Sequence, residues 1–122
     1  MILVDTSIWI DHLHRADPDL VAFLGRDEVG CHTLVIAELA LGSMKQRETV
    51  LGNLARLRQF PVLTHHELMV LVENHRLWGR GLSAGDAHLL GSVKLVAGAR
   101  LWTRDKRLRA AAREIGVDCF VT

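Results

Sequence analysis

The chain opens with MILVDTSIWIDHL, residues 1–13, and the apolar run Ile2-Leu3-Val4 within it decides the fold. The run is short and uniformly apolar, which is typical of a strand buried on both faces of a parallel sheet. Asp5 follows this strand at once, and an ionised carboxylate in such a place costs free energy unless something compensates its charge. The sequence therefore has to supply a partner for Asp5.

Four further strand-like runs alternate with helix-like segments. The strands are predicted at residues 29–32, 60–63, 100–103 and 117–121. Helices are predicted soon after Thr6 and at 18–25, 34–41, 48–58, 65–78, 84–97 and 106–115, several of them opened by capping signals. Strands separated by helices indicate an α/β fold with a mainly parallel sheet covered on both faces. Ligands of such sheets bind beyond the carboxyl ends of the strands, where Asp5 is expected.

Length and composition indicate an ordinary globular protein. The 122 residues suit a single domain over 1–122, with 49% apolar and 24% charged residues. No apolar run is long enough for a membrane span, and the opening residues do not resemble a secretory signal, so we expect a cytoplasmic protein. Cys31 and Cys119 lack metal-type spacing and lie in apolar strands, which favours buried, reduced thiols.

Basic residues gather near the end of the chain. Between Lys94 and Arg113 there are seven lysines and arginines against a single acid, Asp105, although the net charge of the whole chain is only +1. This asymmetry suits an anionic partner, and a solvated helix face would give the same count.

Four acids occupy unusual settings. Glu38 is the only charge in the helical segment LVIAELAL, so we expect it to be buried or at a cleft. Asp86 shares a helix face with leucines and a valine, so it should point inward from the first turn. Asp105 follows the strand at 100–103 by two residues, at the sheet edge expected for Asp5. All four carboxylates could converge there.

A carboxylate cluster needs cations or shared protons, because burial and mutual repulsion both oppose ionisation. A hard divalent ion, Mg²⁺ or Mn²⁺, meets that need and commonly bridges to a substrate phosphate. Each acid also has a simpler interpretation. Asp5 and Asp86 could cap their own helices, Glu38 could pair with an arginine, and Asp105 could be a solvated turn residue.

The motifs Asp5-Thr6-Ser7, Glu38-Leu39 with Gly42 after it, Asp86-Ala87 and Thr103-Arg104-Asp105 together resemble the PIN-domain nucleases. The similarity is greatest to the VapC toxins of bacterial type II toxin–antitoxin pairs, and it spans essentially the whole chain. It implies a three-layer α/β PIN-like fold with a five-stranded parallel sheet. It also implies a toxin that cleaves cellular RNA, such as tRNA or rRNA, with Mg²⁺ or Mn²⁺ as cofactor.

The resemblance also implies roles for individual residues. Asp5, Glu38 and Asp86 match the three core acids that hold the metal, and Asp105 matches a more variable fourth. Thr103 matches a hydroxyl residue often found two positions before that fourth acid, and Thr6 matches the small hydroxyl residue that usually follows the first. Both threonines could orient water at the metal, or serve as a helix cap and a strand-end hydrogen bond. The implied partners are an RNA substrate, an inhibitory VapB-type antitoxin and a second copy of the chain in a homodimer.

Two other functions stay open at this point. The seven histidines allow a metal-free ribonuclease with a histidine acid–base pair, which would work in EDTA and leave a 2′,3′-cyclic phosphate. Alternatively, the chain could be a catalytically idle PIN-like module that binds a protein partner. The apolar helix segment 68–72, with Leu77 and Trp78 beyond it, suits either such a partner contact or burial in the core.

Overall fold

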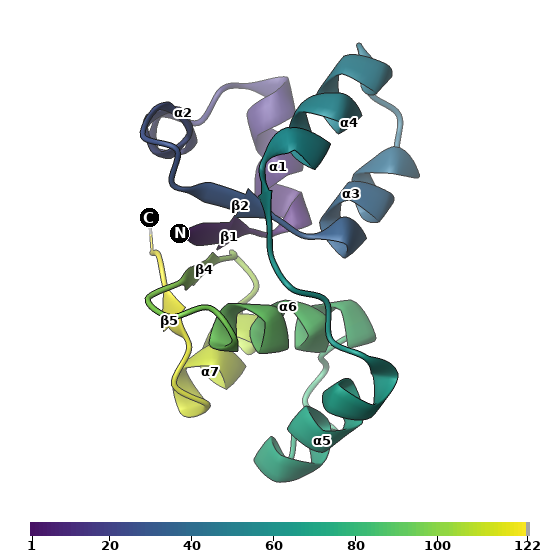
Figure 1. Ribbon diagram of the computed structural model, residues 1–122, viewed down its shortest axis with the longest axis vertical. Helices are drawn as coiled ribbons and strands as arrows, with labels where there is room; N and C mark the ends of the chain where they lie inside the picture. Colours follow the sequence, from purple (N-terminus) through teal and green to yellow (C-terminus); the bar gives the residue numbers. More distant parts are fainter. Residues whose placement is uncertain (122) are drawn as a thin grey trace.

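The computed structural model describes residues 1–121 and confirms the predicted α/β class, with strands and helices in alternation (Figure 1). The strands are β1 (Ile2–Val4), β2 (Val29–Cys31), β3 (Arg58–Gln59), β4 (Arg100–Trp102) and β5 (Asp118–Cys119). The helices are α1 (Thr6–His14), α2 (Pro18–Gly25), α3 (Thr33–Ala40), α4 (Arg47–Arg56), α5 (His65–His75), α6 (Ala84–Lys94) and α7 (Lys106–Glu114).

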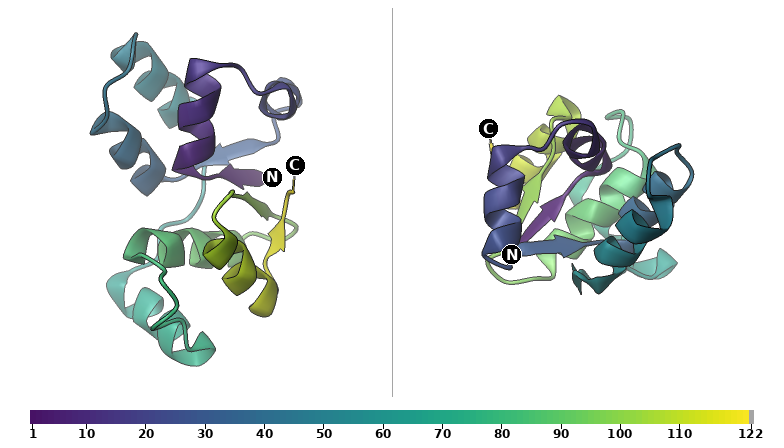
Figure 2. Two further views of the ribbon diagram at one scale, coloured as in Figure 1. Left: turned by 180° about the vertical axis from the view of Figure 1, so that it is seen from behind. Right: turned by 90° about the horizontal axis from the view of Figure 1, so that it is seen from above.

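The five strands form one parallel sheet in the order β3-β2-β1-β4-β5. The chain moves outward from β1 to β2 and β3, and then returns to the other side of β1 to add β4 and β5. Figures 1 and 2 show α1 to α4 on one face of the sheet and α6 and α7 on the other, with α5 farther from the strands. Strand order therefore reverses between β1 and β4, which is where sheets of this class place their ligands.

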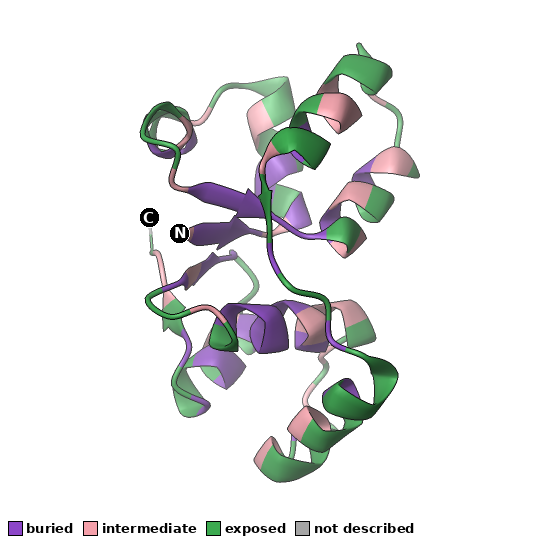
Figure 3. Cartoon of the chain, viewed as in Figure 1, coloured by how far each residue is buried: buried purple, intermediate pink, exposed green. Residues whose placement is uncertain are grey.

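The core lies on both faces of the central strands. Ile2, Leu3 and Val4 are almost fully buried, as are Leu101 and Trp102 of the neighbouring β4 (Figure 3). This explains why β1, and Leu101-Trp102 of β4, read as apolar runs without polar alternation. In β2, which lies between β1 and β3, Gly30 leaves room for the Phe60 ring, because a Cβ atom at residue 30 would clash with that ring.

Capping residues fix where several helices begin. Asp17 caps α2 and precedes proline at the first helical position, as predicted. Thr64 with Glu67, and Ser83 with Asp86, form complete capping boxes at the starts of α5 and α6. These polar signals made the helix starts more predictable than the helix ends.

The structure corrects some boundaries. The third strand is at Arg58–Gln59, not at 60–63, and α4 accordingly stops at Arg56. Pro61 has no N–H for a ladder bond, so pairing to β2 ends once the Phe60 N–H has bonded to the Cys31 carbonyl. Helix α5 ends before Arg76, which has a left-handed backbone, and not at residue 78, and α6 ends at Lys94 and not at residue 97.

Both cysteines are free thiols, as predicted, with Cys31 buried and Cys119 half-buried. Burial raises the pKa of the Cys31 thiol to about 11, so it stays protonated at neutral pH. No helix within residues 1–121 combines the length and the apolar character that crossing a membrane requires.

Candidate functional site

Asp5 and Thr103 meet at the carboxyl ends of the two central strands. The Thr103 hydroxyl donates to Oδ2 of Asp5 at 2.7 Å, and the Asp5 N–H donates to the Trp102 carbonyl at 2.9 Å. Thr103 is only 2% exposed, so its side chain is firmly placed, whereas Asp5 is half-buried and open on one side. The parallel pairing of β1 with β4 thus joins residues that are 98 positions apart in sequence.

Asp105 joins the same group through its backbone. Its N–H donates to the Thr103 hydroxyl oxygen at 3.1 Å, so one hydroxyl connects Asp5 and Asp105. The Asp105 side chain is exposed and its Oδ1 accepts from the N–H groups of Arg107 and Leu108, which makes it the cap of α7. Asp105 therefore lies near the predicted site. It is also, in part, the solvated turn residue that the sequence allowed.

Thr6 lies on the other side of Asp5. The Thr6 N–H donates to Oδ1 of Asp5 at 2.8 Å, so each carboxylate oxygen of Asp5 already accepts one hydrogen bond. The Thr6 hydroxyl is buried and has no hydrogen-bond partner within residues 1–121. A buried hydroxyl beside a carboxylate is one group that could bond to a ligand at this edge.

Asp86 and Glu38 both lie near the first turn of α6. Oδ2 of Asp86 accepts from the Ser83 N–H at 3.0 Å, which completes the capping box. Oε1 of Glu38 lies 3.5 Å from the position that a Cβ atom would occupy on Gly85. In Figure 1 the start of α6 and helix α3 both lie toward the edge of the sheet to which β1 points.

The exposure of Glu38 corrects one prediction. We expected burial or a cleft because the surrounding segment is apolar, but Glu38 is an exposed residue. Helix α3 buries only Val35 and Leu39 and packs mainly against α1 and α4, so its remaining side is open toward α6. Asp86, predicted to point inward, is half-buried.

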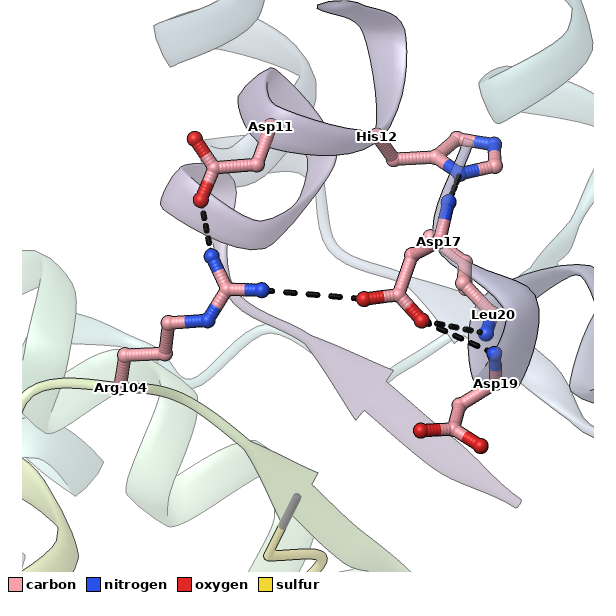
Figure 4. Close-up of polar contacts among 6 residues, drawn as sticks. All are labelled: Asp11, His12, Asp17, Asp19, Leu20 and Arg104. Atoms are coloured by element: carbon pink, nitrogen blue, oxygen red, sulfur yellow. Dashed lines mark hydrogen bonds and ion pairs between the residues drawn. The ribbon is translucent and has the colours of Figure 1, made fainter. Parts of the chain in front are cut away.

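Basic side chains do not neutralise these acids. Within residues 1–121, no lysine, arginine or histidine forms an ion pair with Asp5, Glu38, Asp86 or Asp105. Arg104, which directly precedes Asp105 in the sequence, instead forms an ion pair with Asp11 through its Nη1. Its Nη2 lies 3.7 Å from Oδ2 of Asp17 (Figure 4). The interpretation in which an arginine neutralises Glu38 is therefore wrong.

The acids do not close into a complete metal site as their side chains stand. Over the described residues 1–121, no three carboxylate, imidazole or thiol groups are placed to hold one ion together. The hard oxygen donors, the missing counter-charges and the unpartnered Thr6 hydroxyl nevertheless suit a divalent cation of the Mg²⁺ class. The donor set fits such an ion, and holding it would require the carboxylates to come closer together than they stand here.

Comparison with known proteins gives the family. The model of the PIN domain matches residues 2–114. The chain belongs to the PIN-domain family. It is 69% identical over 117 residues to Ribonuclease VapC32 of Mycobacterium tuberculosis, in two strains, which covers 96% of this chain and 94% of the relative. The resemblance to VapC toxins that the sequence motifs indicated is confirmed.

Two solved structures share the fold. The crystal structure of FitAcB from Neisseria gonorrhoeae aligns with a TM-score of 0.59 at 22% identity, covering 99% of this chain and 97% of that one. The structure of FitAB bound to an IR36 DNA fragment aligns with a TM-score of 0.62 at 20% identity, covering 98% and 94%. At this identity they support the PIN fold alone.

Sequence reasoning missed two features of this PIN domain. One is the ion pairing of Arg104 with Asp11 and Asp17, which only the fold brings together. The other is a pair of histidines, His32 directly before α3 and His88 on α6, whose ring centres lie 6.4 Å apart. The position of His32 directly before an apolar helix was a visible signal for a cap, although histidine is not a common capping residue.

Proposed function

We propose that this PIN domain, residues 1–122, is a divalent-metal-dependent endoribonuclease that acts as the toxin of a toxin–antitoxin pair. The observation that carries the proposal is the meeting of Asp5 with Thr103 at the switch point of the sheet, with no basic residue to neutralise the carboxylate. The 69% identity to a protein named as a ribonuclease supports the same conclusion.

Asp5, Glu38 and Asp86 would hold the metal, with Asp105 as a fourth acid. Mg²⁺ or Mn²⁺ bound there would lower the pKa of a coordinated water and stabilise negative charge on the scissile phosphate. The hydroxyl of Thr103 donates to Oδ2 of Asp5 and so restricts the rotamer of that carboxylate. The buried Thr6 hydroxyl is available to orient water beside Asp5.

The basic helix α7 would hold the RNA backbone. Lys106 and Arg113 are exposed on α7, and neither pairs with an acid within residues 1–121. Arg109, one turn from Lys106, donates to the Arg104 carbonyl, which places its guanidinium near the turn that carries Asp105. These cations would add affinity and salt dependence without selecting a sequence.

Helix α5 offers a surface for a second copy of the chain. A groove of about 420 Å³ runs along α5 and α6 and is lined in part by Leu63, Val70 and Leu95. Val70 and Leu95 are exposed, and so are Met69 and Trp78 at 42% and 58%. This apolar surface favours a homodimer, while a VapB-type antitoxin would inhibit the enzyme by covering its acidic cleft. Light scattering of the V70D variant tests the dimer, which should become a monomer.

Total cellular RNA incubated with the purified protein tests the activity. We expect cleavage with Mg²⁺ or Mn²⁺, no cleavage in EDTA, and ends that carry a 5′-phosphate and a 3′-hydroxyl, because water and not the ribose 2′-hydroxyl attacks. Cleavage in EDTA with 2′,3′-cyclic phosphate ends would indicate the histidine-based enzyme instead. Intact RNA under every metal condition would indicate the idle binding module.

A further inference from the structure

His32 has a defined proton arrangement. Its side chain is fully buried, and its Nδ1 accepts a hydrogen bond of 3.0 Å from the Leu34 N–H, which caps α3. A nitrogen that accepts a hydrogen bond carries no proton, so the neutral ring must carry its proton on Nε2. That Nε2–H group is buried and has no acceptor within residues 1–121.

His88 presents the complementary group. Its Nδ1 is buried on α6 and also has no partner within the described residues. With the proton of His88 on Nε2, this Nδ1 is an acceptor, so the pair consists of one unused donor and one unused acceptor. The two ring centres are 6.4 Å apart.

The separation decides how the groups can interact. Each nitrogen lies only about 1.1 Å from the centre of its ring, so the two nitrogens are about 4 Å apart or more, too far for a direct hydrogen bond. A single water about 2.8–3.0 Å from each nitrogen bridges them if they lie about 4–6 Å apart, and it would satisfy both groups. Burial lowers the pKa of His32, with a smaller contribution from His88, which favours the neutral His32 ring that the arrangement requires.

We propose that one buried water joins Nε2 of His32 to Nδ1 of His88, and that this bridge makes the two histidines positioning residues for Glu38 and Asp86. His32 stands at the start of α3, which carries Glu38, and His88 lies on α6, two residues after Asp86. Helices α3 and α6 also approach each other where Glu38 faces Gly85. The bridge therefore connects the two helices that carry Glu38 and Asp86. The link to metal binding rests on the proposed function.

The proton positions can be measured in the unmodified, metal-free protein. Long-range ¹H–¹⁵N spectra near neutral pH should show a neutral His32 ring protonated on Nε2 and an unprotonated Nδ1 on His88. A proton on Nδ1 of either ring, or a charged His32 ring, would overturn the bridge. Because this measurement needs neither metal nor RNA, its result is independent of the nuclease proposal.

The positioning role is tested by two substitutions of one residue. In H88N the amide oxygen can replace Nδ1 as acceptor, whereas H88A removes the acceptor. We expect the backbone amide resonances of Glu38 and Gly85 to shift in H88A and to return toward their original positions in H88N. We expect the Kd for Mn²⁺ to rise about tenfold in H88A only, the lower range for groups that support metal ligands.

His65→Ala, at an exposed position at the start of α5 that does not line the groove along α5 and α6, is the matched control and should change neither readout. Equal spectra and equal Mn²⁺ affinities in H88A and H88N would overturn the positioning role. If H88A does not fold, the proton positions in the unmodified protein still decide the bridge. If the unmodified protein binds no Mn²⁺, the nuclease proposal fails, while the amide resonances still decide whether His88 positions α3.

Discussion

The Thr103 hydroxyl donates to Oδ2 of Asp5 at 2.7 Å and joins the ends of the two central strands. The bond spans the point where the order of the strands reverses, so it lies where the fold is best able to present a carboxylate to a ligand. Thr103 is buried and held by its strand, whereas Asp5 is partly open. The threonine thus acts as a fixed support for the acid.

Thr103→Val should damage both activity and stability. Valine keeps the shape of threonine but leaves Asp5 and the Asp105 N–H without their shared hydroxyl, at an expected cost of about 1–3 kcal/mol in unfolding free energy. We expect RNA cleavage to fall by at least about tenfold, the equivalent of 1.4 kcal/mol. Thr103→Ser keeps the hydroxyl and should remain near the original in both urea unfolding and cleavage rate. Full activity of T103V would show that the hydroxyl does not support Asp5.

The two capping boxes provide a matched comparison. Asp86 and Glu67 occupy the same third helical position and bond to the backbone of their own cap residue. Asp86→Asn and Glu67→Gln both keep an oxygen acceptor, so each should change the unfolding free energy in chelator only slightly. We expect D86N to abolish cleavage and E67Q to preserve it. Equal activity of the two variants would mean that Asp86 serves only as a cap.

The salt dependence of RNA binding should report the contacts between α7 and the RNA backbone. Replacing exposed Arg113 by glutamine should weaken RNA binding similarly for all sequences and reduce the slope of log affinity against log salt by about one. Arg56→Gln on α4, whose side chain donates to Asn53, is the control and should leave the slope unchanged. Fluorescence anisotropy with a labelled RNA measures both. An unchanged slope in R113Q would remove Arg113 from the RNA path.

Stability should depend on pH through His32. Burial, with His88 as the smaller cause, lowers the pKa of His32 in the folded state below the value of about 6.5 for an unfolded chain. Between these two values the unfolded chain binds more protons, so the contribution of His32 is complete above about pH 6.5 and is lost as pH falls below it. His32→Asn keeps an acceptor for the Leu34 N–H and should flatten this part of the urea-stability profile. A profile identical to that of the unmodified protein would contradict the assignment.

The sequence predicted the features that depend on local pattern. Apolar runs identified β1 and the Leu101-Trp102 part of β4, and polar caps such as Ser83 placed the start of α6. The third strand was missed because Arg58 and Gln59 are both exposed and continue a helical pattern that only pairing with β2 interrupts. Strand order depends on contacts between distant segments, so motif order alone did not give it.

The candidate site was predicted in part. The order of the strands brings Asp5 and Asp105 to one hydroxyl as the parallel-sheet argument expected. Glu38 was misjudged because an apolar helix need not be covered on every side when its neighbours, α1 and α4, pack on only one. The pairing of Arg104 with Asp11 could not be foreseen, since the two residues are 93 positions apart and have no shared motif.

Anomalous X-ray scattering from crystals soaked in Mn²⁺ tests the central claim most directly, because it locates the ion without reference to activity. We expect a manganese peak in contact with the Asp5 carboxylate and with Glu38 or Asp86. This position requires α3 and α6 to move slightly toward β1. A peak elsewhere on the protein, or no peak at Mn²⁺ concentrations that support RNA cleavage, would contradict the central claim.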